Sequence, residues 1–349
     1  MPIPLFVEEN CSIASLTTFE VGGIARFLAQ PSNEAEIVAA LKWANTLGLE
    51  IYPLGGGSNI LASDSPFPGV LIRPENKDIR ILDENNDQVL VFAGAGVVWD
   101  DFVAYTVEHN WQGLECLSGI PGRVGASPMQ NIGAYGQEVA QTIAAVEVRE
   151  IANGQASVIA AQDCAFAYRS SAFKTTWRGR FLISGVHFRL TKDGQPQLRY
   201  RDLSNHFHNS PSPSLAEVRQ AVLDIRRAKS MLYDENDPNH RCAGSFFMNP
   251  IVAQNIADDL AQRCADMPVY PAGEGRCKVS AAWLIEHAGF PKGYRQGRAR
   301  LSDKHVLCLV NDGGAKASEL QALAHTIQVG VREKYGIDLV AEPNVIGRI

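Results

Sequence analysis

Three glycines stand in a row in the segment Pro53-Leu54-Gly55-Gly56-Gly57-Ser58-Asn59, and they directly follow a short predicted strand at residues 50–54. Because glycine has no Cβ, this backbone can take positive φ and bring its N–H groups close to an anion. The loop lacks the Gly-Lys-Ser/Thr ending of an ATP-type phosphate loop, which argues against that class of site. Taken alone, the segment fits a tight turn as well as a nucleotide site.

A second glycine cluster lies within residues 113–136, where few bulky side chains compete with the main chain. A segment of this kind suits an extended dinucleotide that is held by backbone contacts. The cluster comprises Gly119, Gly122, Gly125, Gly133 and Gly136, with Pro121, Gln130, Asn131 and Tyr135 among them. Together the two clusters favour a dinucleotide site over a simple turn at residues 55–59.

Composition narrows the class of protein. The 349 residues are enough for two or three domains, and 46% of them are hydrophobic. A net charge of −6 argues against a nucleic-acid binder, which needs an excess of Lys and Arg.

Seven cysteines without a Cys-x-x-Cys pair indicate free thiols in a reducing compartment, and the dispersed histidines suggest no metal site. With no leader-like or membrane-length apolar segment, we expect a cytoplasmic protein without membrane partners.

Capping residues and apolar periodicity predict helices at residues 33–47, 99–109, from 214 onward, 253–264, 280–288 and 318–335. Asn33 with Glu36 and Ser214 with Glu217 are predicted capping boxes. Strands are predicted at residues 50–54, 70–72, 89–93, 145–151, 181–190 and 305–311, with a hairpin turn at Asn153-Gly154. Residues 191–214 are rich in Pro, Asn, Ser and His, which predicts a long loop and a domain boundary.

Several further motifs occur in order along nearly the whole chain. They are Leu16-Thr17-Thr18-Phe19-x-Val21-Gly22-Gly23, residues 53–61, Ile120-Pro121-Gly122-x-Val124-Gly125, residues 130–136, Tyr168-Arg169-x-Ser171, Gly244-Ser245-Phe246-Phe247 and Glu342-Pro343. In this set the sequence resembles the UDP-N-acetylenolpyruvoylglucosamine reductase family. Tyr200, in a long Leu-Arg-Tyr-Arg-Asp-Leu segment, resembles the subgroup that folds an extra tyrosine-bearing loop over the substrate.

The resemblance implies an α+β fold with an FAD-binding part of the vanillyl-alcohol oxidase type. That part would consist of two α/β subdomains, at residues 1–68 and 69–213. An α+β substrate-binding domain would follow at residues 214–336, and residues 337–349 would form a C-terminal tail that returns to the active site. The boundary expected from the polar segment at residues 191–214 agrees with this division.

The resemblance also implies a reaction and its partners. NADPH would reduce bound FAD, and the reduced FAD would saturate the enol ether of UDP-N-acetylglucosamine enolpyruvate to give UDP-N-acetylmuramate. FAD supplies the hydride chemistry, while the protein supplies geometry and charge. This places the chain in peptidoglycan precursor synthesis, and through it in cell shape and cell division. We expect a monomer with NADPH and the sugar nucleotide as its partners.

By the same resemblance, Ser245 is the proton donor, and Arg169 and Glu342 stabilise the enolate-like intermediate. Each residue has a simpler alternative. Ser245 could be a turn or cap residue, since a hydroxyl is a poor acid without neighbours that stabilise its alkoxide. Arg169 could be a surface cation or a phosphate clamp. Glu342 could be an exposed carboxylate, although in its protonated form it would donate a hydrogen bond to the intermediate.

The remaining site residues are expected from the glycine clusters and the resemblance together. Cofactor contacts are expected at Gly55, Gly56, Gly57, Ser58, Asn59, Ile120, Pro121, Gly122, Gly125, Ser127, Asn131, Gly133 and Tyr135. The resemblance places Arg226 and Lys229 near nucleotide phosphates, with a solvated helix end as the alternative for both. Asn249 and Tyr200 would orient the sugar nucleotide. The loop at residues 233–241 and Arg295 depart from the pattern of the family.

Two other classes of function remain open from the sequence. An FAD oxidase of the same fold would consume oxygen rather than oxidise NADPH, and the Gly-Ser-Phe-Phe and Glu-Pro motifs count against it. A non-catalytic nucleotide-binding protein would keep FAD without turning over. The presence of Ser245, Arg169 and Glu342 counts against that alternative.

Overall fold

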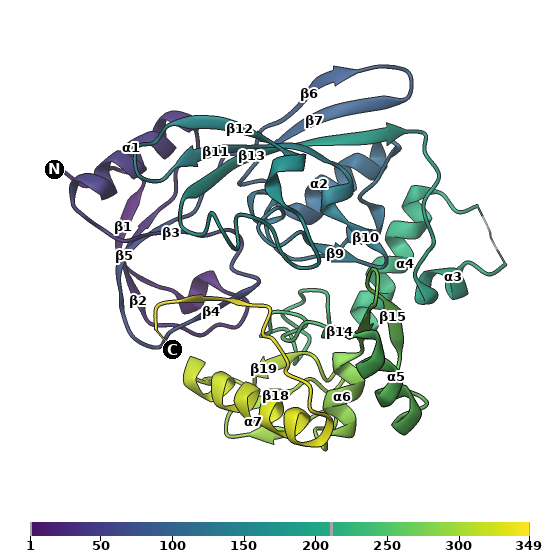
Figure 1. Ribbon diagram of the computed structural model, residues 1–349. Coiled ribbons are helices and arrows are strands. Elements are labelled where there is room, and N and C mark those ends of the chain that lie inside the picture. The colour runs from purple at the N-terminus through teal and green to yellow at the C-terminus, as the bar shows by residue number, and fades with distance from the viewer. Residues whose placement is uncertain (1, 210–211, 349) are drawn as a thin grey trace. The chain divides into compact units, whose positions relative to one another are not determined.

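The computed structural model describes residues 2–209 and 212–348, and the chain in it divides into two compact units (Figure 1). The first unit consists of Met1–Cys11, Ile24–Gly57 and Phe67–Tyr233. The second consists of Ser12–Gly23, Ser58–Pro66 and Asp234–Ile349. The predicted cofactor segment at residues 55–59 therefore changes unit after Gly57.

The first unit begins with a four-stranded sheet in the order β1 (Val7–Ser12), β2 (Ile24–Ala29), β5 (Phe67–Ile72) and β3 (Ile51–Pro53). Strands β2 and β3 both run parallel to β5. Helix α1 (Glu34–Thr46) packs Ile37, Ala40, Leu41 and Ala44 into the same hydrophobic cluster as Val70 of β5. This apolar stripe, spaced three and four residues apart, explains why the segment is a helix.

Capping residues set the ends of α1. The Asn33 side chain accepts a hydrogen bond from the Glu36 N–H at 3.0 Å, and Gly48 follows the helix with a φ of +61°. The predicted capping box is wrong in its second half. The Glu36 carboxylate accepts hydrogen bonds from the main-chain N–H and the hydroxyl of Ser32 instead, because Ser32 offers it two donors.

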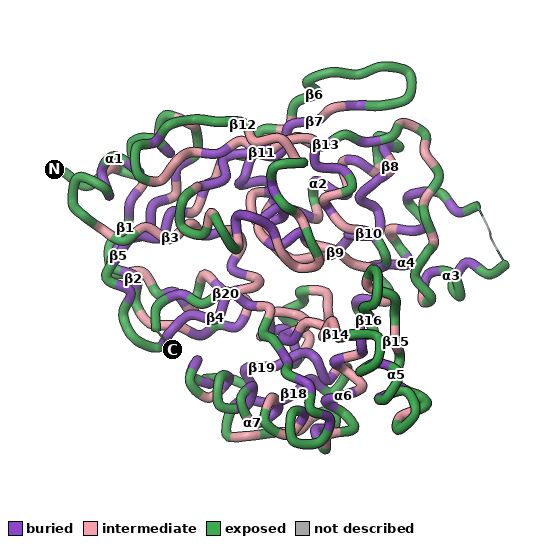
Figure 2. Tube along the Cα trace, in the orientation of Figure 1, coloured by how far each residue is buried: buried purple, intermediate pink, exposed green. Residues whose placement is uncertain are grey.

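A larger antiparallel sheet has the order β12 (Ala156–Ala160), β11 (Ile143–Glu150), β13 (Phe181–Lys192), β7 (Gln88–Gly94) and β6 (Ile79–Glu84), and β8 (Trp111–Gln112) pairs with β13. The Asn153-Gly154 hairpin is confirmed, since it joins β11 to β12 and Gly154 has a φ of +74°. Helix α2 (Trp99–Glu108) covers buried side chains of this sheet, whereas the β6 edge is largely exposed (Figure 2).

The loop predicted at residues 191–214 is partly wrong. Strand β13 continues to Lys192, and a short helix, α3 (Arg201–His206), forms within the segment. Leu203 and Phe207 are buried against Val218 and Val222 of helix α4 (Leu215–Ala228), and this apolar contact gives the polar segment its local structure. Residues 210–211, inside the predicted loop, lie outside the described residues.

Helix α4 belongs to the first unit, so the predicted boundary before residue 214 falls inside that unit. The helix begins with the predicted capping box, because Ser214 and Glu217 exchange both hydrogen bonds. Arg219 of α4 forms an ion pair with Asp100 of α2 at 2.6 Å. These contacts attach α4 to the preceding sequence, and the division between the units comes after Tyr233.

In its described residues, the second unit contains three small sheets and three α-helices. One sheet is antiparallel, with β14 (Ile251–Ala253), β16 (Arg276–Val279) and β15 (Val269–Pro271), and another has β17 (Arg295–Gln296), β18 (Ala299–Leu301) and β19 (Leu309–Asn311). The helices are α5 (Gln254–Arg263), α6 (Ala281–His287) and α7 (Ala317–Tyr335). The strand predicted at residues 305–311 is shorter, because a turn in which the Cys308 N–H bonds to the His305 carbonyl precedes it.

The third sheet pairs the C-terminal segment with an early strand. Strand β20 (Asn344–Ile346) runs parallel to β4 (Ile60–Ala62). The Ser63 hydroxyl donates to the Arg348 carbonyl at 2.7 Å, which extends this contact beyond the strands. Short elements complete the chain, namely β9 (Gly133–Ala134), β10 (Gln137–Glu138) and 3-10 helices at Ala14–Leu16, Glu115–Leu117, Val124–Ala126, Val139–Gln141 and Ala161–Cys164.

Candidate functional site

The two glycine clusters meet within the first unit. A Cβ on Gly56 would lie 2.7 Å from the Cα of Gly122, and a Cβ on Gly55 would lie 2.9 Å from the Cβ of Ala126. Real side chains do not approach main-chain atoms this closely, so residue 56 must be glycine for the loops to touch. Gly57 and Gly122 have φ values of +69° and +132°. The result is a surface built mainly from main chain.

Residues next to Gly122 support this surface from behind. Gly125 packs against Ala95, where a Cβ on the glycine would lie 2.5 Å from the Ala95 side chain. The Ser127 hydroxyl is buried and donates to the Val124 carbonyl at 2.8 Å. Ile120 is partly buried against the core of the large sheet, and Pro121 is partly exposed. Ser127 therefore shapes the loop, whereas Ile120 and Pro121 stay near its surface.

Gly119, at the start of this loop, is held at both of its polar main-chain atoms. Its N–H donates to the Asp100 carboxylate at 2.5 Å, and its carbonyl accepts from Nε of Arg226 at 3.1 Å. Asp100 also receives two hydrogen bonds from Arg219, at 2.6 and 2.8 Å. Sequence reasoning missed Asp100, since a carboxylate in the first turn of a helix is common and carries no specific signal.

The Asp100 carboxylate has a lowered pKa. Burial alone would raise the pKa, but the hydrogen bonds from Arg219 and from the Gly119 N–H lower it below the ordinary value of 3.8. The folded state thus binds this proton less readily than the unfolded state. The stabilisation from Asp100 is therefore complete above pH 3.8 and is lost as the pH falls from there through the lower folded pKa.

We expect Asp100→Asn to lower the free energy of unfolding by about 1–2 kcal/mol at neutral pH, because the charged partner of Arg219 is lost. The deficit relative to the natural chain should shrink as the pH falls below 3.8, because Asp100 of the unfolded natural chain then takes up a proton and the folded state gradually loses its advantage. Urea unfolding at pH 7 and pH 3 measures both effects. Asp101→Asn is the control, since exposed Asp101 lies in the same first turn of α2. Equal deficits in the two variants would contradict the expectation.

Three of the predicted site residues have a strained backbone, two of them just after the second loop. Asn131, Tyr135 and Arg169 have φ values of +48°, +49° and +53°, a region that non-glycine residues rarely adopt. The Asn131 amide donates to Glu138 at 2.9 Å and to the Ala167 carbonyl at 3.1 Å, and its oxygen accepts from the Ala140 N–H at 3.0 Å. These bonds give Asn131 a role in fixing the loop. Backbone strain of this kind is concentrated at functional sites.

Arg169 is oriented by the glycine segment. Its guanidinium donates to the Gly133 carbonyl at 2.5 Å and lies over the Tyr168 ring, with Cζ 5.4 Å from the ring centroid. A Cβ on Gly133 would lie 2.9 Å from the same guanidinium, so glycine at this position leaves room for it. The structure therefore brings together Gly133 and Arg169, two of the predicted site residues, and fixes the direction of the cation.

Tyr135 and Tyr200 form an edge-to-face pair with ring centroids 5.5 Å apart. Tyr135 is 9% exposed, and burial raises the pKa of its phenol, although Arg226 and Lys229 nearby partly oppose the rise. Tyr135 therefore keeps its proton at neutral pH and can donate a hydrogen bond. Tyr200 remains 40% exposed although its ring packs against Tyr135.

Arg226 and Lys229 differ in their surroundings although both lie at the end of α4. Arg226 is 8% exposed and bonds to the carbonyls of Gly119 and Met231. Lys229 is partly exposed and forms an ion pair with Asp202 at 2.6 Å. The contacts of Arg226 favour an anchoring role for this residue, while Lys229 presents its charge closer to solvent.

In the second unit, Ser245 and Glu342 lie on neighbouring extended segments. The Glu342 N–H donates to the Phe246 carbonyl at 2.8 Å, and Phe247 forms an antiparallel bridge with Ala341. The Phe246 N–H in turn donates to the Leu307 carbonyl at 2.8 Å. Ser245 therefore precedes a residue that is fixed at both of its main-chain polar atoms.

Asn59 connects the early segment of this unit to the same region. Its side-chain amide donates to the Glu342 carbonyl at 3.4 Å, and its carbonyl accepts from the Asn344 N–H at 3.0 Å. The Thr18 hydroxyl donates to the Ser58 carbonyl at 3.4 Å and to the Cys242 carbonyl at 2.6 Å. Ser58 and Asn59 thus lie beside the segments that carry Ser245 and Glu342.

Asn249 has a structural contact of its own. Its side-chain oxygen accepts a hydrogen bond from the Ala281 N–H at 2.9 Å, at the first residue of α6. Unpaired N–H groups at helix starts are commonly satisfied in this way. The side-chain oxygen of Asn249 thus holds the start of α6. A hydrogen bond from this side chain to a sugar would come from its amide nitrogen.

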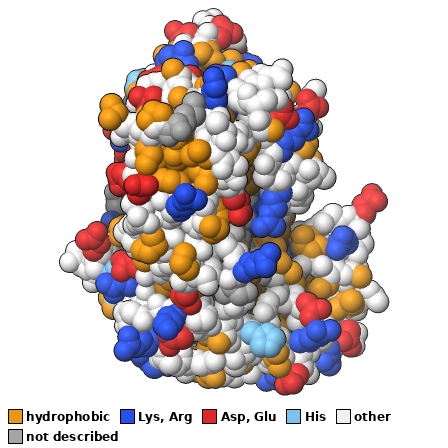
Figure 3. Space-filling model, turned by 90° about the vertical axis from the view of Figure 1, so that its left-hand side faces the viewer, with side chains coloured by type: hydrophobic (Ala, Val, Ile, Leu, Met, Phe, Trp, Pro, Cys, Tyr) orange, Lys and Arg blue, Asp and Glu red, His pale blue; other side chains and the backbone are white. Residues whose placement is uncertain are grey.

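Three observations bear on whether the protein could be a membrane protein, a metal-binding protein or a nucleic-acid binder. In the described part of the chain, no helix has both the length and the apolar character needed to cross a bilayer. Among residues 2–209 and 212–348, no three His, Cys, Asp or Glu side chains are grouped to hold a metal ion. On the face drawn in Figure 3, Lys and Arg side chains alternate with Asp and Glu, as expected from the composition.

Comparisons with known families agree with both units. Residues 25–159 match the FAD binding domain family, and residues 237–346 match the family described as UDP-N-acetylenolpyruvoylglucosamine reductase, C-terminal domain. The fold resembles the crystal structure of UDP-N-acetylenolpyruvylglucosamine reductase from Thermus caldophilus, with a TM-score of 0.68, 24% identity, and coverage of 98% of this chain and 100% of that one. The predicted fold class is confirmed.

Curated relatives cover nearly the whole chain. The UDP-N-acetylenolpyruvoylglucosamine reductase of Thermobifida fusca is 42% identical over 97% of this chain and 98% of its own length. The enzyme of the same name from Salinispora arenicola is 38% identical over 97% of this chain and 95% of its own length. Identity at this level over nearly complete chains, together with both domain matches, shows that the chain belongs to the UDP-N-acetylenolpyruvoylglucosamine reductase family.

Proposed function

We propose that this chain reduces the enolpyruvyl ether of UDP-N-acetylglucosamine enolpyruvate to UDP-N-acetylmuramate, with FAD as its cofactor and NADPH as its reductant. The observation that carries the proposal is the 42% identity to a reductase of that name over 97% of the chain. The reaction belongs to peptidoglycan precursor synthesis, and so to cell shape and division. We place it in the cytoplasm as a monomer.

The first unit fits an FAD dinucleotide. Gly56 and Gly122 touch through main chain alone, and positive φ at Gly57 and Gly122 lets the backbone of both loops turn sharply. Main-chain N–H groups in such loops bind phosphate oxygens, and the absence of side chains lets the backbone approach the ligand closely. Residues 55–57 and 119–125 would hold the cofactor, and Tyr135 would offer a neutral phenol to it.

The protein groups act on the charge that the reaction creates. FAD, when bound, carries the hydride from NADPH to the terminal carbon of the enol ether. Negative charge then develops on the neighbouring carbon and spreads into the carboxylate, where a fixed cation lowers its energy. Arg169, held by the Gly133 carbonyl, is proposed as that cation. Glu342, in its protonated form, is proposed to donate a hydrogen bond to the same charge.

Ser245 is proposed to complete the reaction by giving a proton to the carbon beside the carboxylate. A hydroxyl transfers a proton efficiently only when its position is fixed and its alkoxide is stabilised. The neighbouring main chain is fixed by the bonds of Phe246 to Leu307 and Glu342. Hydride and proton together add the two hydrogens that saturate the double bond, so the reaction consumes one NADPH and one proton.

Substrate contacts follow from charge and exposure. Lys229, partly exposed beside Asp202, is proposed to bind a nucleotide phosphate. Arg226 is proposed to support that helix end through Gly119 and Met231. Tyr200, with its exposed ring, and the amide of Asn249 are proposed to orient the sugar nucleotide.

An anaerobic visible spectrum of the purified protein tests the function. Flavin absorption should be present, should bleach when NADPH is added, and should return when UDP-N-acetylglucosamine enolpyruvate is added to the reduced protein. If the absorption returned only with air, the chain would be an oxidase or another FAD enzyme. A protein that stayed colourless after FAD was supplied would contradict the proposal altogether.

A further inference from the structure

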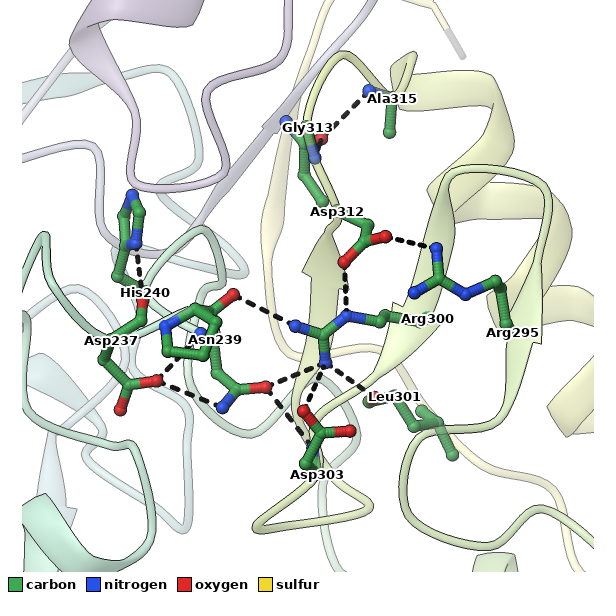
Figure 4. Close-up of polar contacts among 12 residues, drawn as sticks. Asp237, Asn239, His240, Arg295, Arg300, Leu301, Asp303, Asp312, Gly313 and Ala315 are labelled. Atoms are coloured by element: carbon green, nitrogen blue, oxygen red, sulfur yellow. Dashed lines mark hydrogen bonds and ion pairs between the residues drawn. The ribbon is translucent and has the colours of Figure 1, made fainter.

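A buried arginine in the second unit connects segments that the sequence gives no reason to connect. Arg300 of β18 is 4% exposed. Its Nε donates to Asp312 at 2.7 Å, one terminal nitrogen donates to the Asn239 side chain at 2.8 Å, and the other donates to the Pro238 carbonyl at 3.0 Å (Figure 4). The guanidinium thus holds a loop on one side and an acidic residue on the other.

The loop on the first side is also closed on itself. Asn239 is 1% exposed, and its amide nitrogen donates to the Asp237 carboxylate at 3.0 Å. Nδ1 of His240 lies 2.6 Å from the Asp237 carbonyl. These bonds make residues 237–240 a compact turn. The bonds from Arg300 tie that turn to strand β18, and the Asp303 N–H, just after the strand, adds a longer one to the Asn239 side chain at 3.3 Å (Figure 4).

Asp312 links the same arginine to the end of β19. Its carboxylate pairs with Arg300 and with Arg295, which comes from β17 (Figure 4). The hydrogen bonds from Arg300 and then Arg295 lower the pKa of Asp312, so it is charged at neutral pH. The residue before it, Asn311, donates its N–H to the Arg241 carbonyl at 3.0 Å. Arg295 and the loop at residues 233–241, which depart from the family pattern, therefore belong to one network.

This network ends close to Ser245. Cys242 forms a bridge with Val310, and Phe246 is held by Leu307 and Glu342. Between these anchors lies Gly244, which has a φ of +69°, and among the described residues only its chain neighbours come within 4 Å of the position where a Cβ would be. No close contact on that side of Gly244 helps to hold the segment. The location of Ser245 depends on the anchors before and after it.

We propose that Arg300 is a positioning residue for Ser245, acting through Pro238 and Asn239 to fix the segment that leads to the serine. This inference rests on the proposed role of Ser245 as proton donor. It adds a residue outside the family motifs, and it gives a purpose to the ion pairs around Asp312. A proton donor that is displaced by about 1 Å can lose about 100-fold in rate, so remote anchoring of this kind affects chemistry.

The test uses Arg300→Met, which keeps an unbranched apolar side chain and removes every donor. Hydrogen–deuterium exchange in peptides covering residues 238–248 should become about tenfold faster, because the anchor of this segment is lost. In the holoenzyme, oxidation of the reduced flavin by UDP-N-acetylglucosamine enolpyruvate should slow by about 10–100-fold. Reduction of the flavin by NADPH should stay within about twofold of the natural rate, since it does not need the proton donor.

Two further variants complete the design. Asp303→Asn is the matched control, because Asp303 contacts Arg300 only at 3.5 Å and its side chain is 59% exposed; it should change neither exchange nor rates. Asn239→Ala leaves the pair of Arg300 with Asp312 in place and breaks only the bonds to the Asn239 side chain. Asn239→Ala should also slow the oxidation of the reduced flavin without slowing its reduction by NADPH. It replaces Arg300→Met as the test if that variant does not fold.

Each other result overturns the inference. Unchanged exchange at residues 238–248 would show that Arg300 is no anchor, and faster exchange with unchanged oxidation would show that the anchor does not govern Ser245. Equal slowing of both half-reactions would indicate general damage to the fold. Failure of the proposed function is distinguishable, because the natural protein would then not be reoxidised by the sugar nucleotide at all.

Discussion

Ser245→Ala should slow the oxidation of reduced flavin by UDP-N-acetylglucosamine enolpyruvate by about 10²–10⁴-fold, the range expected when a general acid is removed. Flavin reduction by NADPH should keep nearly its natural rate, because no proton passes through Ser245 in that half-reaction. The main chain of the next residue, Phe246, is fixed by Leu307 and Glu342, so the variant should keep the local fold. Stopped-flow absorbance, recorded anaerobically for each half-reaction, measures the difference.

Ser280→Ala provides a control for the alternative that Ser245 is only a cap. The Ser280 hydroxyl accepts a hydrogen bond from the Trp283 N–H at 3.2 Å and caps α6 in the same unit. This variant should lose about 1 kcal/mol of stability and keep both half-reactions. If Ser245→Ala behaved in the same way, or slowed both half-reactions equally, the assignment of Ser245 as proton donor would be wrong.

Gly56→Ala should weaken FAD binding by about 10–100-fold, which corresponds to a loss of about 1.4–2.8 kcal/mol. A Cβ at this position would lie 2.7 Å from the Cα and 3.1 Å from the carbonyl carbon of Gly122. Main-chain atoms cannot rotate away as side chains do, so the two loops must separate, at a cost within the usual range of about 1–3 kcal/mol for overpacking. FAD titration of the apoprotein and the flavin content after gel filtration measure the loss.

Gly179→Ala separates this effect from the general cost of replacing glycine. Gly179 has a φ of +75°, and a Cβ there would meet nothing within 4 Å. The substitution should therefore cost about 1–2 kcal/mol of stability through backbone strain alone. It should leave FAD affinity unchanged. Natural FAD affinity in Gly56→Ala would show that the contact of the two loops does not form the cofactor site.

The elements that were predicted well have signals that are local in sequence. The sequence predicts a helix at residues 99–109, where α2 spans Trp99–Glu108, and another at residues 318–335, where α7 spans Ala317–Tyr335. Helix α7 begins where the Glu319 carboxylate accepts a hydrogen bond from the Lys316 N–H, and it ends at Gly336. The buried faces of both helices are marked by apolar residues about one turn apart. Helix α3 was missed because its stability comes from the packing of Leu203 on α4, which lies later in the chain.

The site shows the same division between local and distant information. The glycine clusters and the family motifs could be found from the sequence, since each is a short run of residues. Their supports could not, because the partners are far apart in the chain. Arg226 reaches Gly119 across 107 residues, and Arg300 reaches Asn239 across 61. A single Asp or Arg in a sequence gives no indication of which distant residue it will contact. Such partners are identified only in the folded structure.

The pairing of β4 with β20 also has a consequence for biosynthesis. Asn59 and Glu342, which are hydrogen-bonded beside these strands, are 283 residues apart. Contacts of such high sequence separation form late, since the cost of closing a long loop must be met first. During translation, β4 leaves the ribosome long before β20 is synthesised, and until then its hydrogen-bonding edge lacks this partner. The segment that carries Ser58 and Asn59 therefore reaches its final arrangement only after β20 has been synthesised, and exposed strand edges in this interval are a hazard for aggregation.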